Sequence, residues 1–188
     1  MGEIKPIQTR YKCCHFRSRL EARWAVYFDS LNVKWEYEPE GFDLGDGLHY
    51  LPDFRVDCWG TRGKPLFDKP FHLYIEVKGE MTEQDLLKIE RFWAPKDAPS
   101  ISGYPVLVVG SPSVYYDYDW CNAPDPLFNY RFIDGDYFGA WPAADDRGRL
   151  YLWGAEGSYC PSEDKHRIEK AVSAALSARF EYGECGST

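Results

Sequence analysis

The sequence predicts an α/β protein of the α+β type, with a central mixed sheet flanked by helices. Three observations lead to this prediction. A helical pattern near the N-terminus is followed by several short strand patterns, an apolar run over 71–77 precedes a second helical pattern, and a short apolar run over 105–109 follows it. The first 110 residues thus have the order helix, three or more strands, helix, strand.

The first helix is predicted over about 19–31. Ser18-Arg-Leu-Glu21 has the S-x-x-E pattern of a capping box, which satisfies free N–H groups at a helix start. Apolar residues then recur at helical spacing: Leu20, Trp24, Tyr27, Phe28 and Leu31.

Short strands are predicted next. Residues 33–38 alternate apolar and charged side chains, with Val33, Trp35 and Tyr37 on one face, until Pro39. The Gly45-Asp46-Gly47 turn separates 42–44 from 49–51, and 52–56 is a further strand. We expect these segments to form an antiparallel meander.

The second half of the core has clearer signals. Phe71–Val77 is the strongest strand pattern in the chain, after a Gly/Pro/Lys-rich loop over 60–70. Thr82–Asp85 resembles a capped helix start, followed by Leu86, Leu87, Ile89 and Trp93 over about three turns. The apolar run over 105–109 is typical of a buried strand.

We divide the chain into a core over 1–110, which includes a basic N-terminal segment, and an extension over 111–188 packed on it. The extension is rich in aromatic residues over 115–159, and these are expected to pack across short antiparallel strands; stacking on unpaired bases is the alternative. A closing amphipathic helix is predicted over 163–181.

Charge limits the functions that the chain can have. A net charge of −8 argues against a protein that coats nucleic acid by bulk electrostatics. Residues 1–24, however, carry six basic and two acidic side chains, a local charge of +4. We therefore expect nucleic-acid contacts from Lys12, Arg17, Arg19 and Arg23, although a solvated helix face also explains them.

The cysteines and the N-terminus indicate a cytoplasmic protein. The six cysteines are scattered without C-x-x-C pairs, so we expect reduced thiols and no zinc. The chain starts without a signal-peptide pattern and has no apolar run of ~18 residues, so no membrane partner is expected. The four histidines are interpreted as structural or surface residues, although His49 is near enough to Asp53 in sequence to touch a phosphate.

Carboxylates and a lysine stand at the ends of two predicted strands. Glu76 and Lys78 lie two residues apart and thus share a face, while Ile75 and Val77 point to the core. Pairing with the strand that begins at Asp53 could bring a second carboxylate beside Glu76, and converging carboxylates favour a hard cation such as magnesium. In phosphodiester hydrolysis such an ion neutralises phosphoryl charge, and a nearby ammonium orients water.

Each of these residues also has a simpler explanation. Glu21 shares an otherwise apolar helix face and is a candidate third acid, but it is also the acid of the capping box. Asp53 fits a Pro-Asp turn. Glu76 and Lys78 fit an ion pair on a solvated sheet face. The combination favours the metal site.

Pro52-Asp53 and Glu76-Val-Lys78 match the pattern of the PD-(D/E)xK nuclease superfamily. Over about 16–110 the chain resembles its small phage and transposon-associated members, including the TnsA-like endonucleases, through 16–21, 37–39, 50–54 and 75–79. The resemblance implies a restriction-endonuclease-like core, phage-encoded in a bacterial host. It also implies that Asp53, Glu76 and the Val77 carbonyl hold Mg²⁺ (with Mn²⁺ as a substitute), that Lys78 acts on water, and that Glu21 assists at a second ion.

The leading hypothesis is a metal-dependent endonuclease that acts on DNA. An exonuclease, a structure-selective resolvase or an RNase would use the same core, since the core contacts phosphate rather than base. A second alternative is a nuclease-like DNA-binding or assembly subunit, because the acidic chain suggests a protein partner. A homodimer is also an option, since two cuts in a duplex usually need two active sites. The third is a plain α/β binding protein with a surface ion pair, which Mg²⁺ and Mn²⁺ would not stabilise.

Overall fold

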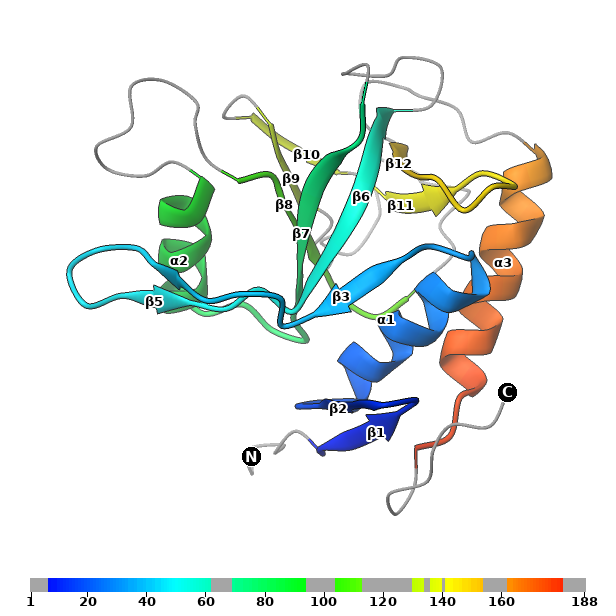
Figure 1. Ribbon diagram of the computed structural model, residues 1–188, viewed down its shortest axis with the longest axis horizontal. Coiled ribbons are helices and arrows are strands. Elements are labelled where there is room, and N and C mark those ends of the chain that lie inside the picture. Colours follow the sequence, from blue (N-terminus) through cyan, green and yellow to red (C-terminus); the bar gives the residue numbers. More distant parts are fainter. Residues whose placement is uncertain are drawn as a thin grey trace, which may run out of the picture.

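The computed structural model describes residues 7–61, 69–93, 104–112, 130–133, 136–139, 141–153 and 162–180. These residues form an α+β fold in which helices cover both faces of a mixed sheet (Figure 1). The helices are α1 (Arg19–Ser30), α2 (Glu83–Trp93) and α3 (Ser162–Ser177). The strands of the main sheet are β3 (Trp35–Tyr37), β6 (Phe54–Thr61), β7 (Phe71–Val77), β8 (Val106–Val109), β9 (Tyr130–Ile133), β10 (Asp136–Gly139), β11 (Trp141–Ala144) and β12 (Leu150–Trp153).

The main sheet has the order β10-β9-β8-β7-β6-β12-β11. β7 pairs antiparallel with β6 and parallel with β8. β3 pairs antiparallel with the first half of β6, and β12 pairs parallel with its second half, so both lie on the same edge of β6. The strands β3, β6 and β7 are thus an antiparallel unit, and α2 makes the crossover from β7 to the parallel β8.

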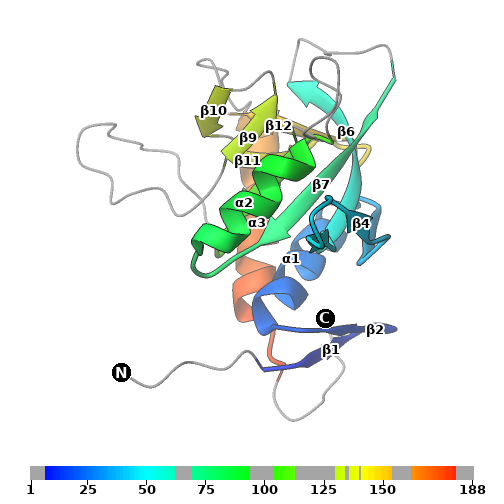
Figure 2. The same ribbon diagram turned by 90° about the vertical axis from the view of Figure 1, so that its left-hand side faces the viewer.

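Each face of the sheet has its own core. α1 and α3 pack side by side on one face, over the larger apolar cluster, which includes Phe54 and Ile75. α2 covers the other face with a smaller cluster that includes Tyr74 and Phe92. Figure 2 shows α2 in front of β7, with α1 and α3 behind the sheet. The strand β7 is buried on both faces because each face is covered by a helix.

The predicted first helix is confirmed in position and in its start. The Ser18 hydroxyl accepts a hydrogen bond from the Glu21 N–H at 3.1 Å, and α1 runs from Arg19 to Ser30. Behind that cap, Ala22, Ala25 and Phe28 are buried against the sheet and α3. The start of α2 is also capped as predicted, since the Asp85 N–H donates to the Thr82 hydroxyl at 3.2 Å.

The predicted meander is wrong in one respect. β4 (Phe42–Asp43) and β5 (His49–Tyr50) pair only with each other in the described residues, as a hairpin inserted between β3 and β6. The turn has positive φ at Gly45, Asp46 and Gly47, as its composition predicts. The hairpin leaves the sheet because the rings of Phe42 and Tyr50 each pack on Phe92 of α2, at 4.8 Å between centroids.

The remaining elements close the fold around the core. β1 (Thr9–Tyr11) and β2 (Cys14–Phe16) form a hairpin that precedes α1. The strands after residue 129 do not form a separate sheet: β9 and β10 extend the main sheet from β8, and β11 and β12 extend it from β6. α3 is the predicted closing helix, but it ends at Ser177, and residues 178–180 are not helical.

Most of the predicted loop over 60–70 and much of the aromatic region over 115–159 lie outside the described residues. Cys13, Cys14 and Cys58 are free thiols. Among the helices that the structure describes, none combines the length and the apolar character needed to cross a bilayer.

Candidate active site

Asp53 and Glu76 lie at the ends of β6 and β7 that the antiparallel register brings together. Phe54 pairs with Ile75, and this register, continued by one residue, places Asp53 opposite Glu76. Both carboxylates are buried, with exposed fractions of 3% for Asp53 and 5% for Glu76. The strand pairing predicted from the sequence is therefore the pairing that the fold has.

The Asp53 carboxylate bonds two donors on opposite sides. Its Oδ2 accepts from the Val77 N–H at 2.7 Å, and its Oδ1 accepts from Nη2 of Arg17 at 2.5 Å. Burial raises the pKa of Asp53 well above its ordinary value, and the charges of Glu76 and Glu21 raise it further. The hydrogen bond from Val77 and the charge of Arg17 oppose that rise without cancelling it. The ionised form of Asp53 is therefore disfavoured in this site.

Glu76 is held by a tyrosine and a lysine. The Tyr50 hydroxyl donates to Oε2 at 2.8 Å, and Nζ of Lys78 lies 3.0 Å from Oε1. Burial raises the pKa of Glu76, while the charge of Lys78 and the hydrogen bond from Tyr50 pull it back. Burial also raises the pKa of Tyr50 well above its ordinary value, with the charge of Glu76 next in importance, so this hydroxyl remains a hydrogen-bond donor at neutral pH.

Lys78 is half-buried between two carboxylates. Its Nζ lies 3.0 Å from Glu76 and 3.0 Å from Oδ1 of Asp85, in the first turn of α2. The other Asp85 oxygen accepts from the hydroxyl of Thr82 at 2.6 Å, so the helix cap also fixes the partner of the lysine. Burial alone lowers the pKa of Lys78, but the two carboxylates outweigh it and the pKa stands above its ordinary value. Lys78 therefore acts at neutral pH as an ammonium.

Glu21 makes the capping contacts that its position in the sequence predicts, and its role at a metal ion stays a prediction. It is buried, with an exposed fraction of 6%, and accepts from the Ser18 hydroxyl at 2.7 Å and from the Arg17 N–H at 3.1 Å. The Tyr37 hydroxyl donates to it at 2.6 Å. These contacts cap α1, and the negative charge of Glu21 also contributes to the raised pKa of Asp53. Glu21 is therefore the third acid near the strand ends.

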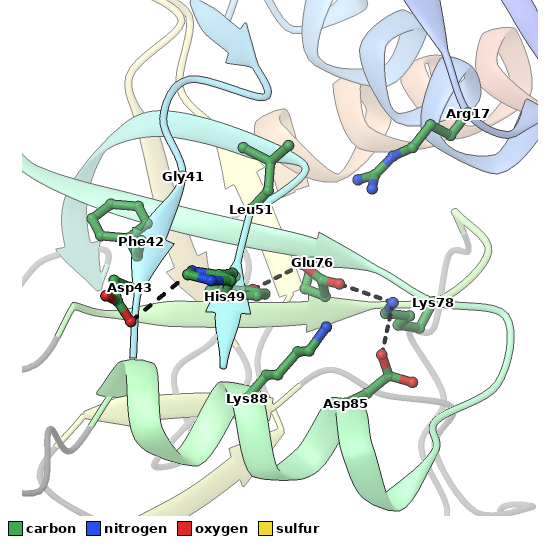
Figure 3. A pocket seen from close by; sticks show the side chains of 11 residues that line it. Arg17, Gly41, Phe42, Asp43, His49, Leu51, Glu76, Lys78, Asp85 and Lys88 are labelled. Carbon is green, nitrogen blue, oxygen red and sulfur yellow. Dashed lines mark hydrogen bonds and ion pairs between the residues drawn. The ribbon is translucent and has the colours of Figure 1, made fainter. Parts of the chain in front are cut away.

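A cavity of about 460 Å³ opens beside Glu76 and Lys78 (Figure 3). The β4–β5 hairpin forms one wall and α2 forms the other, with β7 between them. The lining residues are Arg17, Gly41, Phe42, Asp43, His49, Tyr50, Leu51, Glu76, Lys78, Asp85 and Lys88. Asp53 and Glu21 do not line the cavity. Arg17 does line it, and its guanidinium is bonded to Asp53.

The four basic residues proposed from the sequence have different environments. Arg17 lines the cavity and bridges Asp53 and Glu38, with Nε 2.9 Å from Glu38 Oε1. Lys12 pairs with Asp29 at 2.8 Å, away from the cavity. The side chains of Arg19 and Arg23 each have a buried Nε with no hydrogen-bond partner, and neither lines the cavity. Nucleic-acid contacts from these four residues stay a prediction.

Sequence analysis gave no role to three residues at the site, namely Tyr50, Asp85 and Lys88. The sequence did offer a signal for Tyr50, since this residue lies in a predicted strand three residues before Asp53. Asp85 was recognised only as part of a helix cap, and Lys88 has no motif around it. In the part of the chain that the structure describes, no group of three acidic, histidine or cysteine side chains is already arranged as a metal ligand set.

No protein-family model, no curated protein and no solved structure matches this chain.

Proposed function

We propose that this protein is a metal-dependent endonuclease that hydrolyses phosphodiester bonds in DNA. The observation that carries the proposal is the buried pair Asp53 and Glu76 at paired strand ends, with the Lys78 ammonium on Glu76 at the edge of an open cavity. The order α1, β3, β6, β7, α2, β8 supports it, because it is the order expected of a restriction-endonuclease-like core.

The donor chemistry of the site fits a hard divalent cation. Carboxylate and carbonyl oxygens are the ligands that Mg²⁺ and Mn²⁺ prefer. A bound cation would favour the charged form of Asp53, which burial and then the charges of Glu76 and Glu21 disfavour. Asp53, Glu76 and the backbone carbonyl of Val77 would hold the ion, with Glu21 assisting. Bound there, the ion would neutralise phosphate charge and lower the pKa of water.

The chain itself supplies positioned cations. Lys78 is an ammonium held by Glu76 and Asp85, so it can donate hydrogen bonds to an attacking water or to a phosphoryl oxygen, but it does not serve as a base. The Arg17 side chain is 53% exposed at the cavity, and its guanidinium can bind a phosphate with paired N–H groups. Tyr50 fixes the orientation of Glu76.

The test is cleavage of supercoiled plasmid, linear duplex and single-stranded DNA with Mg²⁺ and then Mn²⁺. We expect Asp53→Asn and Lys78→Ala to lower the cleavage rate by about 10²- to 10³-fold or more, the size of effect seen when one transition-state donor is lost. The matched control is Asp57→Asn on the same strand, whose exposed carboxylate pairs with His72 at 3.1 Å away from the cavity, and it should cut normally.

The outcomes separate the competing functions. Metal-dependent cutting that both site variants lose supports the nuclease and its site. If no DNA is cut while Mn²⁺ still raises the melting temperature of the native protein and not that of Asp53→Asn, the chain is a nuclease-like binding or assembly subunit. Cutting of RNA alone would change the substrate. Absence of both DNA cleavage and stabilisation by metal would contradict the proposal.

A further inference from the structure

Among the described residues, Lys88 differs from Lys78 in having no carboxylate partner. Both side chains line the cavity, and Figure 3 shows the Lys88 ammonium directed from α2 into the space beside Glu76 and His49. Lys78 is neutralised by Glu76 and Asp85 at 3.0 Å each. No carboxylate among the described residues pairs with Lys88. A cation that points into a cavity without a partner is available for an anionic ligand.

The position of Lys88 relative to Lys78 suits a second phosphate. Asp85, which holds Lys78, and Lys88 are three residues apart on α2, so they share a helix face and are separated by roughly 4.5 Å along the axis. Because Asp85 holds the Lys78 ammonium, Lys78 and Lys88 lie along the same side of α2 in one cavity and can both contact phosphates of one strand.

The walls of the cavity limit what else can enter. The β4–β5 hairpin is fastened to α2 because Phe42 and Tyr50 pack on Phe92, with 4.8 Å between ring centroids in each pair. Leu51, which is 36% exposed, gives the hairpin side of the cavity an apolar surface for the face of a base. About 460 Å³ lies in the size range of sites for one small ligand. The hairpin and α2 wall the cavity on two sides (Figure 3), and this volume suits one nucleotide better than a base pair.

We propose that this cavity is a subsite for one unpaired nucleotide next to the bond that is cut, with Lys88 binding its phosphate and Leu51 contacting its base. The substrate is thus DNA that is single-stranded at the cleavage position. The proposal rests on the proposed function in placing the cut at Glu76 and Lys78, but its strand-binding part can be measured without any cleavage.

The experiment measures binding of a fluorescein-labelled oligothymidylate by fluorescence anisotropy, with Ca²⁺ as the only divalent ion. A blunt hairpin duplex of equal length is the competitor. We expect the duplex to compete at least about tenfold less well than unlabelled oligothymidylate. Lys88→Gln should weaken binding by about threefold to tenfold and reduce the slope of log affinity against log salt by about 0.7, the value for one lost contact to a single strand.

The matched control is Lys170→Gln, which removes an exposed lysine from α3 on the other face of the sheet and should change neither value. A merely structural effect of Lys88→Gln would leave the salt slope unchanged and would overturn the subsite, as would equal competition by the duplex. If Lys88→Gln weakens binding but no DNA is cut with Mg²⁺, the subsite stands and the nuclease fails. If DNA is cut through Asp53 and Lys78 while Lys88→Gln binds normally, only the subsite fails.

Discussion

The two faces of the central sheet bury different kinds of side chain, and β7 shows the difference along one strand. Leu73, Ile75 and Val77 belong to the large apolar core under α1 and α3. Tyr74 belongs to the smaller cluster under α2, and Glu76, which shares its face, lines the cavity. Both sets are buried, but only the second includes charges that are held by specific partners.

The face under α1 and α3 stabilises the fold, whereas the face under α2 carries the charged side chains of the candidate site. Apolar burial is non-directional and contributes stability roughly in proportion to area. A buried charge costs stability unless it is paired, so its retention indicates a role other than packing. We therefore expect substitutions on the α1 and α3 face to change stability and substitutions on the α2 face to change binding and rate.

The largest effect on stability is expected for Phe54→Ala. Phe54 is fully buried, and its ring lies against those of Phe16, Phe28, Trp35 and Tyr37. Removal of such a ring leaves a cavity and should lower the free energy of unfolding by about 3–5 kcal/mol, measured by urea denaturation.

Leu176→Ala is the control on the same side of the sheet, because Leu176 is 45% exposed and its truncation should cost less than about 0.5 kcal/mol. A loss for Phe54→Ala no larger than that of the control would show that this face does not carry the stability of the fold.

In the absence of divalent metal, the buried carboxylates on the α2 face should make the free energy of unfolding depend on pH. The folded pKa of Asp53 is raised, so the unfolded chain releases this proton first as pH rises from about 4, the ordinary value for aspartate. In that window the unfolded state binds fewer protons, and the free energy of unfolding must fall with rising pH. Asp85 and Asp145 have lowered pKa values, and their contribution is lost only as pH falls below that point.

Urea denaturation in a chelator across this window, for the native protein and Asp53→Asn, measures the effect. The variant should show the shallower decline, with the remainder due to Glu76, whose pKa is also raised. Added Mn²⁺ should reverse the trend in the native protein, because it binds the ionised carboxylates. Parallel curves in the absence of metal would contradict the assignment of the pH dependence to Asp53.

Much of this arrangement follows from local patterns in the sequence. The Ser18 cap and the helical spacing after it predict α1, and the apolar run over 71–77 predicts β7. The meeting of Asp53 with Glu76 also follows, because two antiparallel strands that end near these residues have few registers that keep their apolar faces inward.

The positions of the two cavity walls, the β4–β5 hairpin and α2, cannot be predicted from such patterns. The hairpin of β4 and β5 has ordinary strand signals, and it leaves the sheet only because rings distant in sequence pack on Phe92. Asp85 and Lys88 enter the site because α2 crosses β7 at one particular place, and helical periodicity does not specify that place. Side chains placed by tertiary packing are therefore the ones that sequence analysis missed.

We expect the smallest effect for Arg17→Gln. This variant tests most directly how charge is balanced on the α2 face. The Arg17 guanidinium lies on Asp53 and Glu38, where it would compete with the proposed divalent cation for the same Asp53 oxygen and would repel it. Because the side chain is about half exposed, solvent reduces this effect to about 1 kcal/mol, so Mn²⁺ should bind about fivefold more tightly to the variant in calorimetry.

DNA cleavage by Arg17→Gln should nevertheless be slower, since Arg17 is the proposed contact to phosphate. Tighter Mn²⁺ binding together with slower cleavage would distinguish Arg17 from a residue that only holds a metal ligand in place. The matched control is Arg149→Gln, which breaks a similar pair with Asp145, at 2.6 Å, in the turn between β11 and β12. It should change neither readout. If Arg17→Gln instead weakened Mn²⁺ binding, Arg17 would be needed to hold Asp53 in place, and the α2 face would depend on its ion pairs for structure as the other face depends on its apolar core.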